Sequence, residues 1–309
     1  MSELFLPPQH IGFIGLGNMG HPMARSLAES GYTLVVADAN PDALKHFAVK
    51  TACEQAADLK ALGGACRVVI TMLPDGAAVR EVLLSYRGVA AGLGRGSTVI
   101  DMSSSSPVGT RDLALELASR EIALIDAPVS GGVKKAIDGT LAIMVGGPPD
   151  VVERCRPILE VMGKVFHTGE TGSGHAMKSL NNYLSAATLA ISAEAVIAGT
   201  QFGLDPARMI EILNASTGRS NTTEHKYPNF ILPRSFDSGF AIGLMAKDLR
   251  LALEVATSVS APKALLQVCA DLWSRAEAQL GPTADHTEVV KFLESLVEEQ
   301  ETQSKKPDR

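Results

Sequence analysis

The sequence is poor in the residues that build disulfide scaffolds and metal sites. It has four cysteines among 309 residues, without zinc spacing and far below the density of a cross-linked secreted domain. The seven histidines show no metal spacing either. We therefore expect isolated, reduced thiols, no metal and a cytoplasmic protein. The cysteines are Cys53, Cys66, Cys155 and Cys269.

The chain also lacks a basic excess and a secretory start. Its net charge of −6 argues against nucleic acid or an anionic membrane as a partner, because both require a basic footprint. Residues 1–10 contain no basic start followed by an apolar run. The most apolar stretch, residues 183–202, approaches membrane-spanning length but contains Glu194. We predict a core helix there and no membrane span.

What is present is typical of a globular protein, with 46% hydrophobic and 20% charged residues. The length allows two domains with cores of their own. We place a first domain at residues 1–170 and a second at 171–300. Residues 301–309 are charged, lack large apolar side chains and are predicted to form a flexible tail.

A glycine-rich turn lies between an apolar run at residues 11–14 and a helical segment at 22–30. A second strand, rich in β-branched residues, follows at residues 33–37 and ends at Asp38. Strand, glycine turn, helix, strand and acid together form the dinucleotide-binding fingerprint. The alternative is a glycine turn with an incidental aspartate. The predicted cofactor-binding turn comprises Gly15, Leu16, Gly17, Asn18, Met19 and Gly20.

Each glycine of that fingerprint has a physical role. Gly15 permits the tight turn, Gly17 lets the backbone approach a pyrophosphate, and Gly20 lets helix and strand pack closely. Asp38 would accept hydrogen bonds from an adenosine ribose. Residues 39–42 contain no arginine to hold a 2′-phosphate, so NAD is favoured over NADP.

Strands and helices continue to alternate through the first half. Apolar runs at residues 68–73, 98–102 and 124–126 predict an α/β domain with a Rossmann-like, doubly wound parallel sheet. Ligands of such sheets bind at the carboxyl ends of the strands. The residues predicted at that edge are Leu73 and Pro74 for the cofactor, Ser103 for the substrate, and Ser104.

A serine and two glycines, Ser130, Gly131 and Gly132, follow the strand that ends near Asp126. Their N–H groups could form a nest for a substrate carboxylate. A simple turn that contains glycine is an equal alternative.

An alanine-rich helix is predicted after Gly172 and Gly174. On it Lys178, Asn181 and Asn182 lie three and four positions apart and share one face. A solvated stripe would be the ordinary interpretation. However, the residues that follow are small or apolar, and a lysine on a buried helix must face a polar cavity.

The second half shows no strand pattern, so we predict an all-α domain joined to the first by this long helix. Its apolar stripes indicate a subunit interface and hence a homo-oligomer, a homodimer or homotetramer.

The chain resembles the β-hydroxyacid dehydrogenases, the family of 3-hydroxyisobutyrate dehydrogenase and tartronate semialdehyde (2-hydroxy-3-oxopropionate) reductase. The motifs that carry the resemblance lie at residues 15–20, 101–107, 126–147, 172–182 and 247–249. The resemblance implies a Rossmann-like domain followed by a helical domain like that of 6-phosphogluconate dehydrogenase. It implies interconversion of a small 3-hydroxy carboxylate and its semialdehyde or oxo acid with NAD.

The resemblance also implies roles for individual residues. Lys178 matches the catalytic lysine, a general acid–base, and Asn182 the amide that helps hold the substrate, with Asn181 beside it. Ser130, Gly131 and Gly132 match a carboxylate cradle. Ser104 matches a position that contacts cofactor and substrate, and Lys247 a second lysine near the nicotinamide.

One departure leaves the substrate open. Many relatives have a tryptophan in the segment that here reads Arg219 to Thr223, so this wall is more polar. Tartronate semialdehyde reduction is the main alternative. An imine reductase and a non-catalytic NAD-binding protein are disfavoured, because Lys178 is present.

Overall fold

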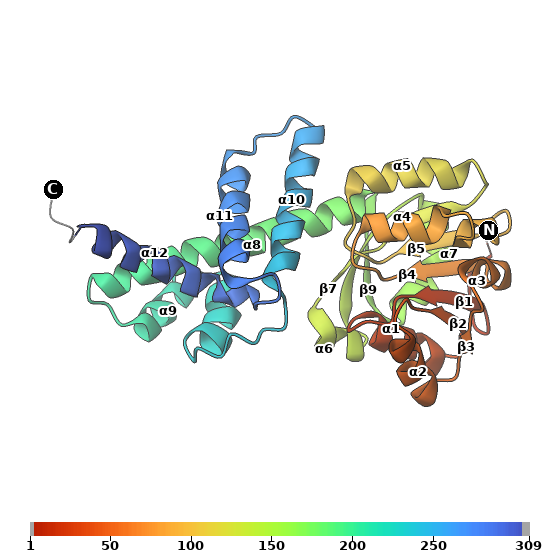
Figure 1. The fold of residues 1–309 in the computed structure, drawn as a ribbon, viewed down its shortest axis with the longest axis horizontal. Helices are drawn as coiled ribbons and strands as arrows, with labels where there is room; N and C mark the ends of the chain where they lie inside the picture. The colour runs from red at the N-terminus through yellow and green to blue at the C-terminus, as the bar shows by residue number, and fades with distance from the viewer. Residues whose placement is uncertain (1–2, 305–309) are drawn as a thin grey trace. The chain divides into compact units, whose positions relative to one another are not determined.

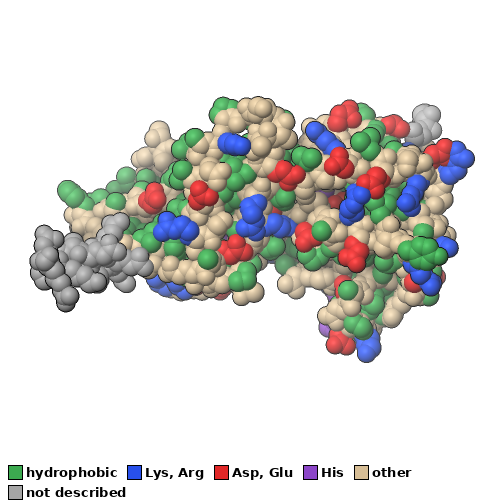
Figure 2. All heavy atoms as spheres, turned by 45° about the horizontal axis from the view of Figure 1, so that its top comes forward, with side chains coloured by type: hydrophobic (Ala, Val, Ile, Leu, Met, Phe, Trp, Pro, Cys, Tyr) green, Lys and Arg blue, Asp and Glu red, His purple; other side chains and the backbone are tan. Residues whose placement is uncertain are grey.

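The structure is a computed structural model that describes residues 3–304, with side chains through residue 297. The chain divides into two compact units, Met1–Lys178 and Ser179–Arg309, described separately below (Figure 1). The division falls somewhat later than the predicted boundary at residue 170. Of the predicted flexible tail, residues 301–304 belong to the last helix and 305–309 lie outside the described residues. On the face in Figure 2, acidic and basic side chains are interspersed.

The first unit is built on one sheet, nine-stranded within the described residues. Its order is β3-β2-β1-β4-β5-β6-β8-β7, with β9 paired to β8. Pairing is parallel from β3 to β6, which confirms the doubly wound Rossmann-like arrangement, whereas β8 pairs antiparallel with β6 and β7. The strands are β1 (His10–Ile14), β2 (Thr33–Ala37), β3 (Glu54–Gln55), β4 (Val68–Thr71), β5 (Thr98–Asp101), β6 (Ala123–Asp126), β7 (Val129–Ser130), β8 (Leu141–Gly146) and β9 (Gly163–Gly169).

Four helices of this unit, α2 to α5, begin at a residue whose side chain caps the first turn. The side chains of Asn40, Asp58, Asp75 and Ser106 each accept a backbone N–H of the first turn that would otherwise have no partner. The helical segments are α1 (Gly20–Glu29), α2 (Pro41–Lys50), α3 (Leu59–Ala65), α4 (Gly76–Leu84), η1 (Val89–Ala91), α5 (Pro107–Ala118), α6 (Gly132–Ile137) and α7 (Pro149–Glu160).

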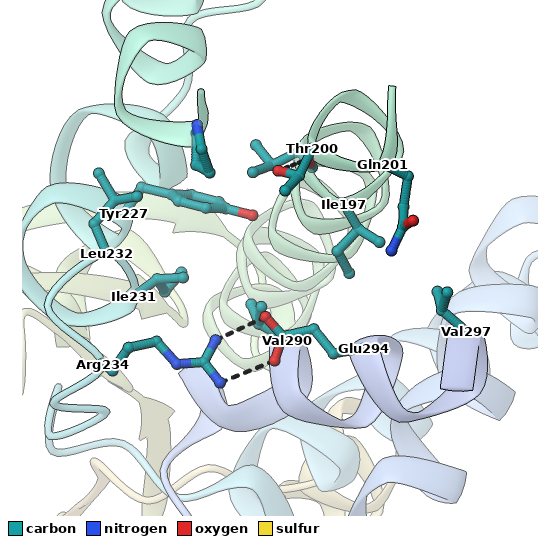
Figure 3. A pocket seen from close by; sticks show the side chains of 12 residues that line it. Ile197, Thr200, Gln201, Tyr227, Ile231, Leu232, Arg234, Val290, Glu294 and Val297 are labelled. Atoms are coloured by element: carbon teal, nitrogen blue, oxygen red, sulfur yellow. Dashed lines mark hydrogen bonds and ion pairs between the residues drawn. The ribbon is translucent and has the colours of Figure 1, made fainter. Parts of the chain in front are cut away.

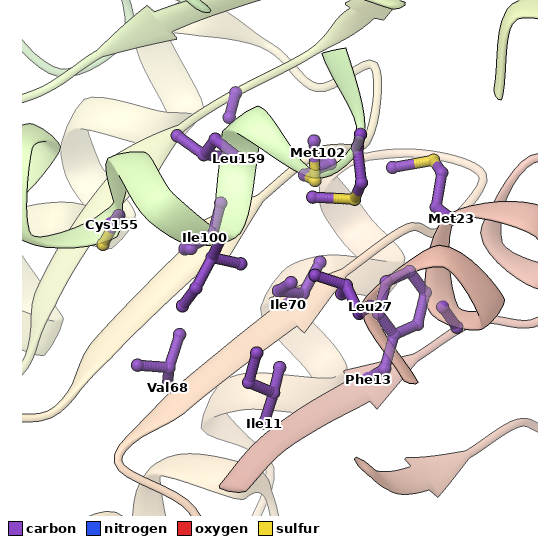
Figure 4. Close-up of a cluster of buried hydrophobic side chains, with 14 of the residues drawn as sticks. Ile11, Phe13, Met23, Leu27, Val68, Ile70, Ile100, Met102, Cys155 and Leu159 are labelled. Atoms are coloured by element: carbon purple, nitrogen blue, oxygen red, sulfur yellow. The ribbon is translucent and has the colours of Figure 1, made fainter. Parts of the chain in front are cut away.

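Both faces of the sheet are buried, which explains why its strands are continuous apolar runs. In β4, Val68 and Ile70 belong to one hydrophobic cluster and Val69 to another, because successive side chains point to opposite faces. The same alternation occurs in β5 at Val99 and Ile100. Figure 4 shows the first cluster, to which α1 and α7 also contribute.

The second unit is helical, as predicted. Its core surrounds the fully buried Trp273, which stacks on His286 at 6.5 Å between ring centroids. The helical segments are α8 (Ser173–Gln201), which begins in the first unit, α9 (Pro206–Asn214), η2 (Thr222–Ile231), α10 (Ile242–Ser258), α11 (Ala264–Leu280), η3 (His286–Glu288) and α12 (Val289–Ser304). Of these, η2 is a π-helix.

Helix α8 is less buried than the sequence suggests. By length and composition alone it could cross a membrane, which is weak evidence, since core helices pass the same test. Only 28% of its apolar window is buried, so the expectation of a fully buried helix is wrong. Leu184 and Ile191 are 63% and 60% exposed. These two side chains leave an apolar surface on one side of the helix.

Candidate active site

The glycine turn between β1 and α1 has the shape that a pyrophosphate requires. Gly15 has a φ of 99°, and a Cβ there or at Gly20 would collide with backbone carbonyl oxygens. A Cβ at Gly17 would meet nothing within 4 Å, so the turn leaves room for a ligand. Helix α1 has no side-chain cap at Met19, so its first N–H groups are not used by a capping side chain. These residues fit a dinucleotide.

Asp38 ends β2 and braces the glycine turn. Its Oδ2 accepts the Leu16 N–H at 2.6 Å, and its Oδ1 accepts the Asn40 N–H at 2.7 Å. Each carboxylate oxygen can accept more than one hydrogen bond, so Asp38 can accept a further one from a ribose hydroxyl. The sequence fingerprint predicts a ribose contact for Asp38 but does not reveal its hydrogen bonds to Leu16 and Asn40.

The carboxyl ends of β4 and β5 are joined by hydrogen bonds. The Ser103 Oγ accepts the Leu73 N–H at 2.9 Å, and Ser103 is buried. Asp101, also buried, accepts from the Thr71 hydroxyl, the Ser103 N–H and the Ser105 hydroxyl. Ser103 therefore supports the Leu73 turn, while Ser104 is half-buried and Pro74 exposed.

Two buried groups that sequence reasoning missed fix the start of α8. Asp126 accepts the backbone N–H groups of Gly172 and His175 at 2.6 and 2.8 Å. Burial raises the pKa of the Asp126 carboxyl, although these N–H groups and His175 act in the opposite direction. The His175 ring contacts the Ser103 carbonyl oxygen through Nε2 at 3.1 Å and the Thr110 hydroxyl through Nδ1 at 2.9 Å.

Lys178 lies one helical turn after His175 and is half-buried. It belongs to the first unit, as do Ser130, Gly131 and Gly132. The two glycines are exposed and have φ values of 135° and 72°, a conformation that favours glycine. The turn between β7 and α6 therefore presents accessible backbone that side-chain-bearing residues could not form without strain.

The remaining predicted site residues lie in the second unit. Asn181 donates to the Asn182 Oδ1 at 3.1 Å, and Asn182 donates in turn to the Asp248 carboxylate. Asp248 is buried and Lys247, beside it on α10, is half-buried. The sequence motif contains Asp248, yet its role in orienting Asn182 was missed.

Part of the polar segment Arg219 to Thr223 is buried. Thr222 and Thr223 are buried, and the Thr223 hydroxyl donates to the Ser220 carbonyl oxygen at 3.0 Å. Arg219 and Asn221 are the exposed side chains of this segment.

A pocket of about 560 Å³ also lies in the second unit, but none of the predicted site residues lines it. Figure 3 shows its largely apolar wall and the ion pair of Arg234 and Glu294, with N–O distances of 2.7 and 2.9 Å. The pocket therefore does not mark the predicted chemistry.

The glycine turn, the aspartate at the end of β2 and the strand order β3-β2-β1-β4-β5-β6 together define a dinucleotide-binding domain of the Rossmann type. Within the described residues, no group of three His, Cys, Asp or Glu side chains could hold a metal.

Comparison with known proteins identifies the family. The NAD-binding domain of 6-phosphogluconate dehydrogenase matches residues 10–169, and the NAD-binding domain of NADP-dependent 3-hydroxyisobutyrate dehydrogenase matches residues 172–293. The chain belongs to the β-hydroxyacid dehydrogenase family and is an NAD(P)-dependent oxidoreductase that acts on a CH–OH group.

Three similar proteins illustrate the range of the family. The 2-(hydroxymethyl)glutarate dehydrogenase of Eubacterium barkeri is 39% identical, over 93% of this chain and 95% of its own. The 3-sulfolactaldehyde reductase of Escherichia coli is 36% identical, over 87% and 90%. The structure of Mycobacterium tuberculosis 3-hydroxyisobutyrate dehydrogenase with L-serine superimposes with a TM-score of 0.85 at 33% identity, over 92% and 99%.

Proposed function

We propose that the enzyme interconverts a small 3-hydroxy carboxylate and its semialdehyde or oxo acid, with NAD as the cofactor and Lys178 as the general acid–base. The observation that carries this proposal is the fixed start of α8. Asp126 and His175 hold the first turn of the helix, and Lys178 projects from the next turn. A group that transfers a proton must be held within hydrogen-bond reach of the reacting oxygen.

The other residues would bind and orient the substrate. The N–H groups of Ser130, Gly131 and Gly132 would hold its carboxylate. Lys178 would take the proton from the hydroxyl oxygen during oxidation and return it during reduction. NAD, when bound, supplies the nicotinamide that accepts the hydride. Asn182, oriented by Asp248, would donate to the substrate.

Further contacts are proposed for the flanking side chains. Asn181 would support Asn182, to which it is hydrogen-bonded. Ser104 would contact cofactor and substrate, and Lys247 would lie near the nicotinamide. Ser103 would act indirectly, because its hydroxyl holds Leu73.

We propose NAD, not NADP, as the cofactor because of the residues at the carboxyl end of β2. A 2′-phosphate would approach the Asp38 carboxylate, and residues 39–42 contain no arginine that could compensate. The family that matches residues 172–293 is described as NADP-dependent, and assay of the wild type with both cofactors tests the preference.

Two classes of substrate are candidates. The E. barkeri and M. tuberculosis relatives are named for 3-hydroxy acids, which supports oxidation of a 3-hydroxy carboxylate. The alternative is reduction of a semialdehyde such as tartronate semialdehyde, and the E. coli relative is named as a reductase of 3-sulfolactaldehyde.

The protein is further proposed to be a cytoplasmic homodimer or homotetramer without nucleic-acid or membrane partners. The exposed apolar side chains Leu184 and Ile191 on α8 support contact with a second copy. The interspersed charges in Figure 2 give no support to an extended basic footprint on that face.

A nicotinamide-absorbance assay tests the proposal. The wild-type enzyme would be assayed with 3-hydroxyisobutyrate, 2-(hydroxymethyl)glutarate, tartronate semialdehyde and a cyclic imine, each with NAD(H) and NADP(H). Lys178→Ala should lose nearly all turnover and keep NAD affinity, while the exposed control Lys45→Ala should match the wild type. Turnover retained in Lys178→Ala would refute the role of this lysine.

A further inference from the structure

His175 joins three elements of the first unit at the start of the helix that carries Lys178. It is only 1% exposed and lies in the first turn of α8. Its ring reaches from the Ser103 carbonyl oxygen, 3.1 Å from Nε2, to the Thr110 hydroxyl on α5, 2.9 Å from Nδ1. All four residues belong to the first compact unit, so these contacts lie within one part of the chain.

The contact with Ser103 determines which ring nitrogen of His175 carries a hydrogen. A carbonyl oxygen can only accept a hydrogen bond, so Nε2 must donate one. A second polar neighbour of Nε2 is the Asp101 carboxylate, an acceptor whose Oδ2 lies 3.7 Å away. The ring is therefore an oriented, buried donor that faces the carboxyl end of β5.

The contacts of His175 continue to the turn that is predicted to bind the cofactor. The Ser103 hydroxyl accepts the Leu73 N–H at 2.9 Å, so one serine contacts both the Leu73 turn and the His175 ring. Lys178 follows His175 by three residues and shares its helix face. The two residues are about 4.5 Å apart along the axis, since an α-helix rises ~1.5 Å per residue. An unbroken series of hydrogen bonds and covalent bonds thus connects the Leu73 turn to the lysine.

The packing beneath α8 does not by itself fix the direction of the Lys178 side chain. A Cβ at Gly174 would lie 2.3 Å from the Met144 carbonyl oxygen and 2.9 Å from that of Asp126. The helix therefore approaches strands β6 and β8 through bare backbone. Because a glycine has no side chain that could interlock with the strands, the rotation of the helix about its axis depends on the polar contacts of its neighbours, and above all on the ring of His175.

We propose that His175 is a positioning residue for the reaction, because its Nε2–H bond to the Ser103 carbonyl oxygen sets the direction of Lys178 relative to the Leu73 turn. This inference rests on the proposed function, in which Lys178 moves the proton and the cofactor lies at the Leu73 turn. The buried imidazole aligns proton transfer with hydride transfer and does not itself touch the substrate. Its loss lowers kcat and leaves binding almost unchanged, since a displacement of about 1 Å can cost about a hundredfold in rate.

Two amide substitutions separate the contacts of the two ring nitrogens. The glutamine amide nitrogen reaches the position of Nε2, so His175→Gln can keep the bond to Ser103 and lose the contact with Thr110. The asparagine amide is shorter and reaches the position of Nδ1, so His175→Asn keeps the contact with Thr110 and loses the bond to Ser103. The same two substitutions at His10, which is exposed at the start of β1, are the matched controls.

The variants would be assayed with the hydroxy acid from the panel above that the wild type turns over fastest. His175→Asn should lower kcat by about a hundredfold, with less than about a threefold change in KM and in the Kd of NAD. His175→Gln should keep kcat within about tenfold of the wild type, and both His10 variants should match it. Thermal unfolding reports any common loss of stability. Equal kcat values in the two His175 variants, or a change in KM larger than that in kcat, would overturn the inference.

A measurement on the wild type does not depend on whether the variants fold. In the nuclear magnetic resonance spectrum of isotope-labelled histidine, the His175 Nε2 should carry a hydrogen that exchanges slowly with water, as a buried donor does. A His175 ring with its hydrogen on Nδ1 alone would contradict the bond to Ser103 and overturn the inference.

The failure of this inference can be told apart from the failure of the proposed function. If Lys178→Ala keeps its turnover, the proposed function fails and the inference fails with it. If Lys178→Ala is inactive while His175→Asn keeps the wild-type kcat, Lys178 retains its role and only the positioning by His175 is wrong.

Discussion

The Asp126 carboxylate accepts the backbone N–H of His175 at 2.8 Å, which ties the end of β6 to the first turn of α8. The same carboxylate accepts the Gly172 N–H at 2.6 Å. A negative charge at a helix N-terminus is favourable, because it satisfies N–H groups that have no partner within the helix. The strand thereby fixes the helix that carries Lys178.

Asp126→Asn should destabilise the first unit and reduce turnover. An amide has only one oxygen to accept from the two N–H groups, so a loss of about 2–4 kcal/mol in the free energy of unfolding is expected. Denaturant unfolding measures this loss, and NAD affinity should remain because the glycine turn is untouched. The exposed Asp138→Asn serves as control. An unchanged unfolding midpoint for Asp126→Asn would show that the carboxylate does not hold α8.

Gly131→Ala should impair carboxylate binding. The residue has a φ of 135°, and an added Cβ would lie 2.5 Å from the Lys135 Cδ, so the turn must change shape. The KM of a 3-hydroxy carboxylate is expected to rise by about tenfold, since one misdirected N–H group can cost 1–2 kcal/mol. Gly94→Ala is the control, because its Cβ meets nothing within 4 Å and its φ is not positive. Equal KM values for the two variants would exclude the turn as the cradle.

Substitutions at the carboxyl end of β2 should change the preference for NAD over NADP. Because Asp38 also holds Leu16 and Asn40, we choose Asp38→Asn, which keeps an acceptor oxygen, together with Ala39→Arg at an exposed position. The double variant should gain about tenfold or more in kcat/KM with NADP, since arginine pairs well with a phosphate. Asp38→Asn with Ala39→Ser is the comparison. If NADP serves the wild type as well as NAD, the assignment of Asp38 is wrong.

His286 should make the second unit sensitive to acid. Burial, followed by the charge of Lys226, lowers the pKa of His286 to about 4 from 6.5. Between these values the unfolded chain binds the proton more readily, so stability should fall as the pH drops from 6.5 to 4, by about 2–3 kcal/mol.

His286→Phe should flatten this part of the stability profile, as urea unfolding at several pH values would show. The substitution also removes a contact with the Phe240 carbonyl oxygen, so the slope, not the absolute stability, is the readout. The exposed His225→Phe should keep the wild-type slope. A wild-type slope in His286→Phe would mean that other groups cause the acid sensitivity.

The fold class was accessible from the sequence because local signals agreed with the global arrangement. Runs such as residues 68–71 are apolar at every position, as a strand buried on both faces must be, and the capping residues mark where helices begin. The antiparallel pairing of β8 was missed. β7 has only two residues, too few to show a period, and its pairing with β8 depends on the turn around Gly131.

The sequence likewise predicted one part of the candidate site and missed another. Motif residues such as Gly15 and Lys178 could be proposed from the sequence because they lie close to the other residues of their motifs. Partners distant in sequence could not be. Ser103 was assigned to the substrate, but its contact with Leu73 joins residues 30 positions apart. The His175–Ser103 contact spans 72 positions and depends on how α8 packs, which no local period encodes.

The π-helical form of η2 determines the direction in which the Lys226 side chain points. A π-turn contains one more residue than an α-turn, so deleting a single residue before Lys226 would turn its side chain by about 100° around the helix. A one-codon deletion or insertion in this segment would thus remove or introduce this buried cation in a single evolutionary step.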